Sequence, residues 1–175
     1  MAFELSIHEQ ARVFDALQGT LGFDELSPAE RHQFVLNFNF SDEQEPLTWI
    51  ARQPDTDAGT ALALYWSLDP AYWSQYANTK EASAQVGFPS YELFKEIEAK
   101  YLGGFYTSQN YSFDPSEFIA AGFAEEPESG NELTIRASPG APFDRQDVET
   151  VLPEGVALSD LPAAGVRFSV SALND

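Results

Sequence analysis

Signals for the start of an α-helix recur along the first 125 residues, and this repetition restricts the fold more than any other feature of the sequence. In the first signal, Ser6 stands three residues before Glu9, the spacing of a capping box, in which each side chain accepts a hydrogen bond from an otherwise unpaired backbone N–H. In later signals proline occupies the first helical position, where its missing N–H is not needed. The signals open at Ser6, Ser27, Pro46, Asp57, Asp69, Ser90 and Asp114. They predict a mainly α, compact helical domain over residues 1–125.

Apolar residues at helical spacing follow these starts and set the expected extent of each helix. Glycine or proline stands near several of the expected ends. The expected helices run over residues 7–18 and 28–38, from Pro46 to before Pro54, from Asp57 through Trp66, from Asp69 through Tyr76, from Ser90 to Gly103, and from Asp114 onward.

The stretch D-T-D-A-G-T-A-L-A-L-Y-W, residues 55–66, joins two acids directly to the densest apolar run of the chain. An EF-hand loop needs a further acid and a glycine one position later, so the pattern argues against a calcium site. Asp57 suits a helix N-cap, and Gly59 with its neighbouring alanines lets a neighbouring helix approach closely. Apolar side chains then surround the helix axis, which predicts a buried central helix.

Aromatic residues gather in two parts of the chain. The spacing of the first group favours a shared core over a cofactor site, because large rings bury well together. This group consists of Trp49, Tyr65, Trp66, Tyr72 and Trp73. The second group is G-G-F-Y-T-S-Q-N-Y-S-F at residues 103–113, with the Tyr, Asn, Ser and Gly composition of recognition surfaces. A binding loop and simple packing over the helices both fit this second segment.

The pattern changes after Glu125, where E-E-P-E-S-G-N-E reads as an acidic, turn-forming linker. Apolar and polar residues then alternate over 133–137 and again over 166–170, as in half-buried strands. We therefore expect residues 126–175 to form a C-terminal extension with a small β-hairpin or two short strands, packed on the helical domain. The fold class becomes α+β overall, with helices dominant.

Composition places the chain among folded globular proteins, since 43% of its residues are hydrophobic and 14% aromatic. The longest uninterrupted apolar run, residues 61–66, is far shorter than the roughly 20 residues of a membrane-spanning helix. The N-terminus has Glu4 in place of a basic region and lacks the apolar stretch of a signal peptide. Cysteine is absent, which excludes disulfides and thiolate chemistry. We expect a cytoplasmic protein that does not enter a membrane.

The net charge of −19 is the strongest indication of what the chain contacts. Such a field repels phosphate backbones, so we expect no nucleic-acid partner. Solubility alone can explain an acidic surface. Alternatively, an acidic face docks a basic protein and gains association rate from electrostatic steering.

Motifs of catalysis are missing from the sequence. His8 and His32 lie on separate expected helices without zinc-binding spacing, and we expect both to be surface or helix-end residues. The glycines form neither a P-loop nor a dinucleotide fingerprint. We therefore predict no catalytic residues, no metal, no cofactor and no enzyme activity. A pair of carboxylates acting in a small hydrolase stays open as an alternative.

The segment 34–76 resembles an uncharacterised bacterial domain-of-unknown-function family, number 4274 in that series (DUF4274-like). The resemblance is carried by N-F-N-F at 37–40, Pro46, D-A-G-T-A-L-A-L-Y-W at 57–66, and the aromatic Tyr72. The family has no established activity, so no site residues are transferred from it. Small domains of this kind resemble those found near secreted toxins, and the resemblance therefore implies a binding role.

We expect an immunity protein that neutralises a cognate, plausibly basic, bacterial toxin by direct binding and occlusion of its active site. Acidic runs supply charge complementarity, and two tyrosines of the 103–113 segment supply aromatic anchors. The candidate contacts are Asp42, Glu43, Glu45, Tyr106, Tyr111, Glu125, Glu126, Glu128 and Glu132. An adaptor or chaperone for a secreted effector is the alternative within the same class.

Overall fold

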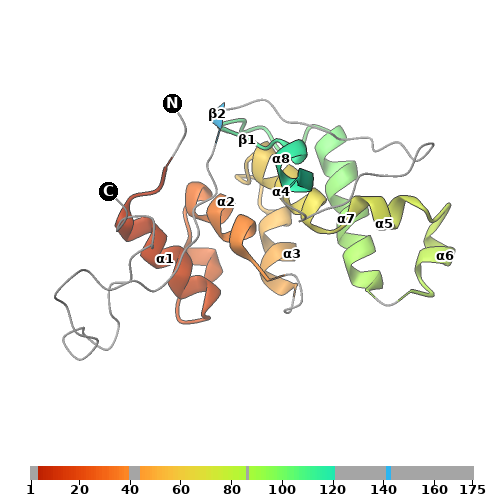
Figure 1. Ribbon diagram of the computed structural model, residues 1–175, viewed down its shortest axis with the longest axis horizontal. Helices are drawn as coiled ribbons and strands as arrows, with labels where there is room; N and C mark the ends of the chain where they lie inside the picture. The colour runs from red at the N-terminus through yellow and green to blue at the C-terminus, as the bar shows by residue number, and fades with distance from the viewer. Residues whose placement is uncertain (1–3, 40–43, 86, 121–140, 143–175) are drawn as a thin grey trace. The chain divides into compact units, whose positions relative to one another are not determined.

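A computed structural model describes residues 4–39, 44–85, 87–120 and 141–142 of the chain (Figure 1). The chain separates into two compact units, with the first 39 residues in one and residues 40–142 in the other. Helices dominate the described residues of both units, which confirms the mainly α prediction. The two units are taken in turn.

The described part of the first unit is a pair of packed helices with a short 3-10 turn between them. Both capping boxes that the sequence predicts are formed, with Ser6 and Ser27 accepting from the backbone N–H of Glu9 and Glu30. Arg12 ties the pair together, because its Nε lies 2.8 Å from Glu30 Oε1. The elements are α1 (Ile7–Leu17), η1 (Phe23–Glu25) and α2 (Pro28–Asn37).

Helix α2 is buried along most of its length, including polar residues. His32 is only 1% exposed, and this burial lowers its pKa to about 3 because water no longer solvates the charged ring. The expectation of a surface or helix-end histidine is therefore wrong for His32. His8, in contrast, is exposed at the start of α1, as expected.

The second unit is built around α4 (Ala58–Ser67), which contacts α3, α5, α7 and β1. Every residue from 58 to 66 is buried, as the sequence predicts for a central helix. Tyr65 stacks on Phe94 of α7, with ring centroids 4.8 Å apart. The other elements are α3 (Glu45–Arg52), α5 (Pro70–Ser74), α6 (Thr79–Ala82), α7 (Phe88–Leu102), β1 (Tyr111–Ser112), α8 (Pro115–Ala120) and β2 (Ala141–Pro142) (Figure 1).

Helix α7 begins earlier than predicted. Gly87, with φ 91°, takes the N-cap position and offers no side-chain cap, whereas the sequence assigns the cap to Ser90. The Ser90 hydroxyl instead accepts a hydrogen bond from Gln44 Nε2 at 2.6 Å. This contact sets the first turn of α7 beside the start of α3. The helix ends before Gly103 and Gly104, as predicted.

The described strands form a minimal parallel pair rather than a hairpin. Tyr111 lies opposite Ala141, and Ser112 lies opposite Pro142. The strands expected at 133–137 and 166–170, and the linker expected at 125–132, lie outside the described residues. In the part of the chain that the structure describes, no helix combines the length and apolar character needed to cross a bilayer.

Candidate functional site

The Asp57 carboxylate joins the start of α4 to the segment that follows α7. Its Oδ1 accepts hydrogen bonds from the backbone N–H of Gly59 at 2.9 Å and of Tyr111 at 3.3 Å. Its Oδ2 accepts from the Ser108 hydroxyl at 2.9 Å and from the backbone N–H of Asn110 at 2.6 Å. Only 1% of Asp57 is exposed, so these donors replace water as the stabilising environment of its charge.

Gly59 allows this junction to form. A Cβ at this position would lie 2.2 Å from the carbonyl oxygen of Tyr111, far inside van der Waals contact. The backbone N–H of Ala58 also donates to the carbonyl oxygen of Ser108 at 2.8 Å. The Asp-x-Gly pair at 57 and 59 therefore does two things, because the acid holds the 108–111 segment and the glycine makes room for it.

The chemistry open to Asp57 is limited by this arrangement. A metal ion or substrate would have to displace backbone donors that then remain buried and unpaired, which is unfavourable. The N-cap prediction is confirmed, and the role of Asp57 extends beyond it to a contact across more than fifty residues of sequence. We interpret the junction as structural.

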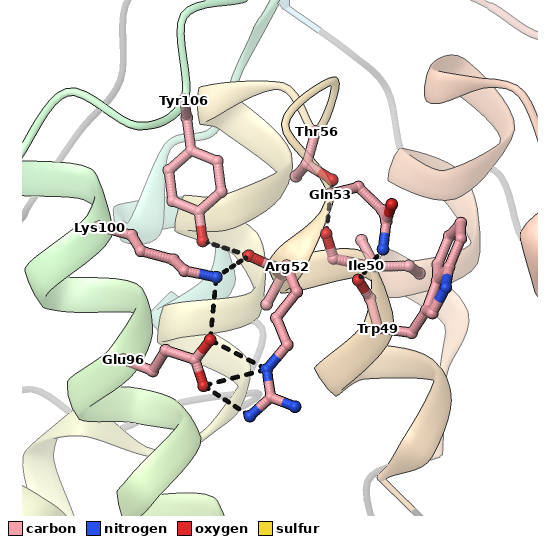
Figure 2. A network of polar contacts seen from close by, with 9 residues as sticks. Trp49, Ile50, Arg52, Gln53, Thr56, Glu96, Lys100 and Tyr106 are labelled. Carbon is pink, nitrogen blue, oxygen red and sulfur yellow. Dashed lines mark hydrogen bonds and ion pairs between the residues drawn. The ribbon is translucent and has the colours of Figure 1, made fainter.

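A second polar cluster surrounds the C-terminal end of α3 (Figure 2). The last carbonyl groups of a helix lack intrahelical partners, and side chains supply them here. Gln53 Nε2 donates to the carbonyl oxygen of Trp49 at 3.0 Å, and the Thr56 hydroxyl donates to that of Ile50 at 2.6 Å. The cluster thus begins as a set of caps for a helix end.

The Ala51 carbonyl oxygen receives two donors, one from α7 and one from the segment that follows α7. The Tyr106 hydroxyl donates to it at 2.8 Å, and Lys100 Nζ lies at 3.2 Å. Burial raises the pKa of Tyr106, with Glu96 adding to the shift through its charge, so the phenol stays protonated and remains a donor at neutral pH. The ammonium of Lys100 also opposes the negative end of the α3 dipole.

Glu96 completes the cluster by binding two cations (Figure 2). Arg52 approaches it with Nε 3.0 Å from Oε1 and Nη2 2.9 Å from Oε2, and Lys100 Nζ lies 2.9 Å from Oε1. The hydrogen bond from Arg52, with the charges of both cations, lowers the pKa of Glu96 to about 2. A carboxylate held so firmly in its charged form is a poor proton donor or acceptor near neutral pH.

The candidate contacts predicted from the sequence fall into three groups. Glu45 is exposed at the first position of α3. Tyr106 and Tyr111 are 5% and 7% exposed, which corrects their expected role as aromatic anchors, because almost no ring surface is left for a partner. The remaining candidates, Asp42, Glu43, Glu125, Glu126, Glu128 and Glu132, lie outside the described residues.

The structure instead exposes an aromatic residue that the sequence assigns to the core. Tyr72 of α5 is 37% exposed, whereas its neighbour Trp73 is 4% exposed. Alternation of this kind follows from a short helix lying flat on the unit, since adjacent residues then point to different sides. No signal in the sequence distinguishes the two rings.

Within the described residues, no group of three or more His, Asp or Glu side chains is arranged to hold a metal ion. Comparisons with curated proteins and with solved structures give no match. A family model does match, over residues 26–102, and its description is "Domain of unknown function (DUF4274)". The match confirms the resemblance inferred from 34–76 and extends it from the start of α2 to the end of α7. The matched segment is less than half of the chain, so it marks a similarity of residues 26–102 to that family.

Proposed function

We propose that this chain is an acidic, cytoplasmic immunity protein that binds a basic toxin and covers its active site. The observation that carries the proposal is the charge balance of its surface. The chain has a net charge of −19, and Arg52, Lys95 and Lys100 each lie against a glutamate of α7. These cations are therefore already neutralised locally, whereas acids such as Glu45, Asp69 and Glu92 are exposed.

The carboxylates of the two polar clusters are already held by partners within the chain, which supports a binding protein over a hydrolase. A glycosidase-like reaction needs one carboxyl that gives up a proton near neutral pH and a second that stays charged. Asp57 is occupied by chain donors, and the pKa of Glu96 is lowered rather than raised. Both carboxylates serve the fold, which leaves recognition by the surface as the function that the described residues favour.

The test begins with the reading frames next to the gene, because immunity proteins act on a toxin made by the same cell. Each neighbouring product is expressed alone and together with this chain, and growth is measured. An immunity protein restores growth when co-expressed and forms a complex with the toxin in calorimetry. Toxicity that persists at saturating levels of this chain, for every neighbouring product, would contradict the proposal.

Deletion of the gene separates the proposal from an adaptor role. Loss of an immunity protein slows growth, and deletion of the toxin gene restores it. Loss of an adaptor leaves growth unchanged and abolishes export of the effector. The second result would replace immunity with the adaptor or chaperone function.

The acidic run at the start of α3 gives a kinetic test of steering. We expect the triple variant Asp42→Asn, Glu43→Gln, Glu45→Gln to associate with the toxin roughly tenfold more slowly at low salt, with little change in dissociation. A matched control removes the same charge from the first unit, through Glu4→Gln, Asp24→Asn and Glu25→Gln. Equal slowing in both triple variants would assign the effect to net charge rather than to this run.

A further inference from the structure

The α5 segment carries an exposed tyrosine that is held rigidly from behind. Tyr72 meets Trp73 edge to face, with centroids 4.8 Å apart, and meets Tyr76 edge to face at 5.6 Å. Neither neighbour lies flat against the Tyr72 ring, and 37% of the residue stays exposed. A large apolar ring fixed in this way loses little conformational entropy when a partner covers it.

Contacts behind the ring fix its position on the second unit. Trp73 is buried and packs against Tyr91 of α7, with centroids 5.4 Å apart. The Tyr76 hydroxyl donates to the Tyr72 hydroxyl at 3.0 Å, which links the two rings at their polar ends. This hydrogen bond also raises the pKa of Tyr76, which keeps the Tyr76 hydroxyl protonated.

Acidic residues stand close to Tyr72 in the sequence, and Asp69 contacts it in the structure. Asp69 lies three residues before Tyr72 and is exposed, with one carboxylate oxygen 3.2 Å from the Tyr72 backbone nitrogen. Glu81 and Glu92 are also exposed, and Lys80 is the single base between residues 69 and 92. An electron-rich ring beside carboxylates attracts cations, and a planar guanidinium can both stack on the ring and pair with a carboxylate.

We propose that Tyr72, supported by Trp73 and Tyr76 and flanked by Asp69, is the docking point for an arginine side chain of a protein partner. The inference rests on the proposed function, because it names the chemical group of a basic partner that this chain recognises. Arginine fits better than lysine, since the ammonium of lysine is compact, strongly hydrated and unable to stack. A neutral glycan would also stack on a tyrosine, but it has no positive charge to pair with the Asp69 carboxylate.

The test uses fluorescently labelled hexa-arginine and hexa-lysine peptides and measures their Kd for the full chain by anisotropy at fixed salt. We expect the wild-type protein to prefer hexa-arginine by about threefold, because a guanidinium stacks flat on the ring whereas an ammonium meets it only as a point charge. Tyr72→Ala should bind both peptides equally. Tyr72→Phe should keep most of the preference, because the ring rather than the hydroxyl stacks.

Phe105 provides a matched control. It is also 37% exposed in the same unit, but Lys100 Nζ already lies 4.7 Å from its ring centroid. Phe105→Ala should therefore leave the arginine preference intact. The proposal is overturned if wild-type protein binds the two peptides equally, if Tyr72→Ala retains the preference, or if Phe105→Ala loses it to the same extent.

Failure of this inference is distinguishable from failure of the proposed function. If this chain neutralises a toxin and Tyr72→Ala binds that toxin with unchanged affinity, the immunity role holds and the arginine site is wrong. If no neighbouring product is neutralised while the Tyr72-dependent arginine preference is measured, the site holds and immunity is wrong. Unchanged melting of Tyr72→Ala confirms that either result reports binding.

Discussion

Asp57 and Glu96 are two carboxylates of the same unit that do similar work in opposite surroundings. Asp57 is 1% exposed and is held by neutral N–H and O–H donors of the chain. Glu96, with 28% of its side chain exposed, is held by Arg52 and Lys100. Each links segments that are distant in sequence, but water can replace the partners of only one of them.

Burial, more than the number of contacts, therefore decides what each polar cluster contributes to stability. Groups that lose a partner at a buried site stay unpaired, whereas groups at an exposed site are solvated again. The same contacts limit the chemistry that each carboxylate can perform. Asp57 is closed to ligands, and Glu96 is held in its charged form by its cations.

The largest expected effect is the loss of the buried carboxylate. Asp57→Ala should lower the free energy of unfolding by about 4 kcal/mol, because it removes the N-cap and leaves the Gly59 and Tyr111 N–H groups buried without their acceptor. Urea denaturation measures the change. Ser6→Ala, which removes an exposed N-cap, should cost only about 1 kcal/mol. Equal losses in the two variants would refute the argument from burial.

Gly59→Ala should have the next largest effect, about 3 kcal/mol, because the new methyl group displaces the Tyr111 backbone. The double variant with Asp57→Ala should lose less than the sum of the two changes, since both release the same segment. The three free energies of unfolding form a double-mutant cycle. Strict additivity would show that acid and glycine act on separate parts of the unit.

Much of the local structure is predictable from the sequence because it is determined within one helical turn. The caps at Ser6, Ser27, Asp57 and Asp69 depend on residues two or three positions away, and all of them form. The sequence places the start of α7 too late, because the residue that bonds Ser90 lies far away in the sequence. Ser90 resembles a cap, but Gln44, far away in sequence, takes its hydroxyl.

The candidate site was less predictable, because exposure depends on tertiary packing. Tyr106 and Tyr111 belong to a segment with the composition of a recognition loop, yet contacts with Ala51 and Asp57 draw them into the interior. Tyr72 and Trp73 are adjacent aromatic residues, and only the orientation of α5 decides which of them is exposed. The acidic charge, in contrast, is a property of composition and is plain in the sequence.

Glu96→Gln should have a smaller effect, about 1 kcal/mol at pH 7, because its partners return to water. The pKa of Glu96 is lowered to about 2 in the folded protein, below its usual value near 4.5. Its contribution is therefore complete above about pH 4.5 and disappears as the pH falls towards 2. Melting temperatures of wild type and variant should converge over this window. A constant difference down to pH 2 would contradict the ion-pair explanation.

The difference in stability between wild type and Glu96→Gln is also free of the pH dependence that a second group, His32, adds to both proteins. The depressed pKa of His32, about 3, makes the folded protein favour the neutral ring, so His32 lowers stability as the pH falls from 6.5 towards 3. Both proteins carry His32, so their difference reports Glu96. A steeper loss for wild type alone between pH 6.5 and 5 would therefore break this assignment.

The smallest effect is expected for Tyr106→Phe, about 0.5 kcal/mol, because Lys100 still donates to the Ala51 carbonyl oxygen. Thermal unfolding at neutral pH measures it. Tyr106→Phe combined with Lys100→Met should exceed the sum of the single changes, since the carbonyl then loses both side-chain donors. Additive losses would show that the two donors are independent.

Hydrogen exchange at the Asn110 and Tyr111 amides tests most directly whether Asp57 is a structural residue. Both amides donate to its carboxylate, so they should exchange slowly in the wild-type protein and much faster in Asp57→Ala. Amides in the middle of α7 should keep the same ranking of exchange rates in both proteins. Rapid exchange of both amides in the wild-type protein would contradict this claim, because the carboxylate would then be free for a ligand.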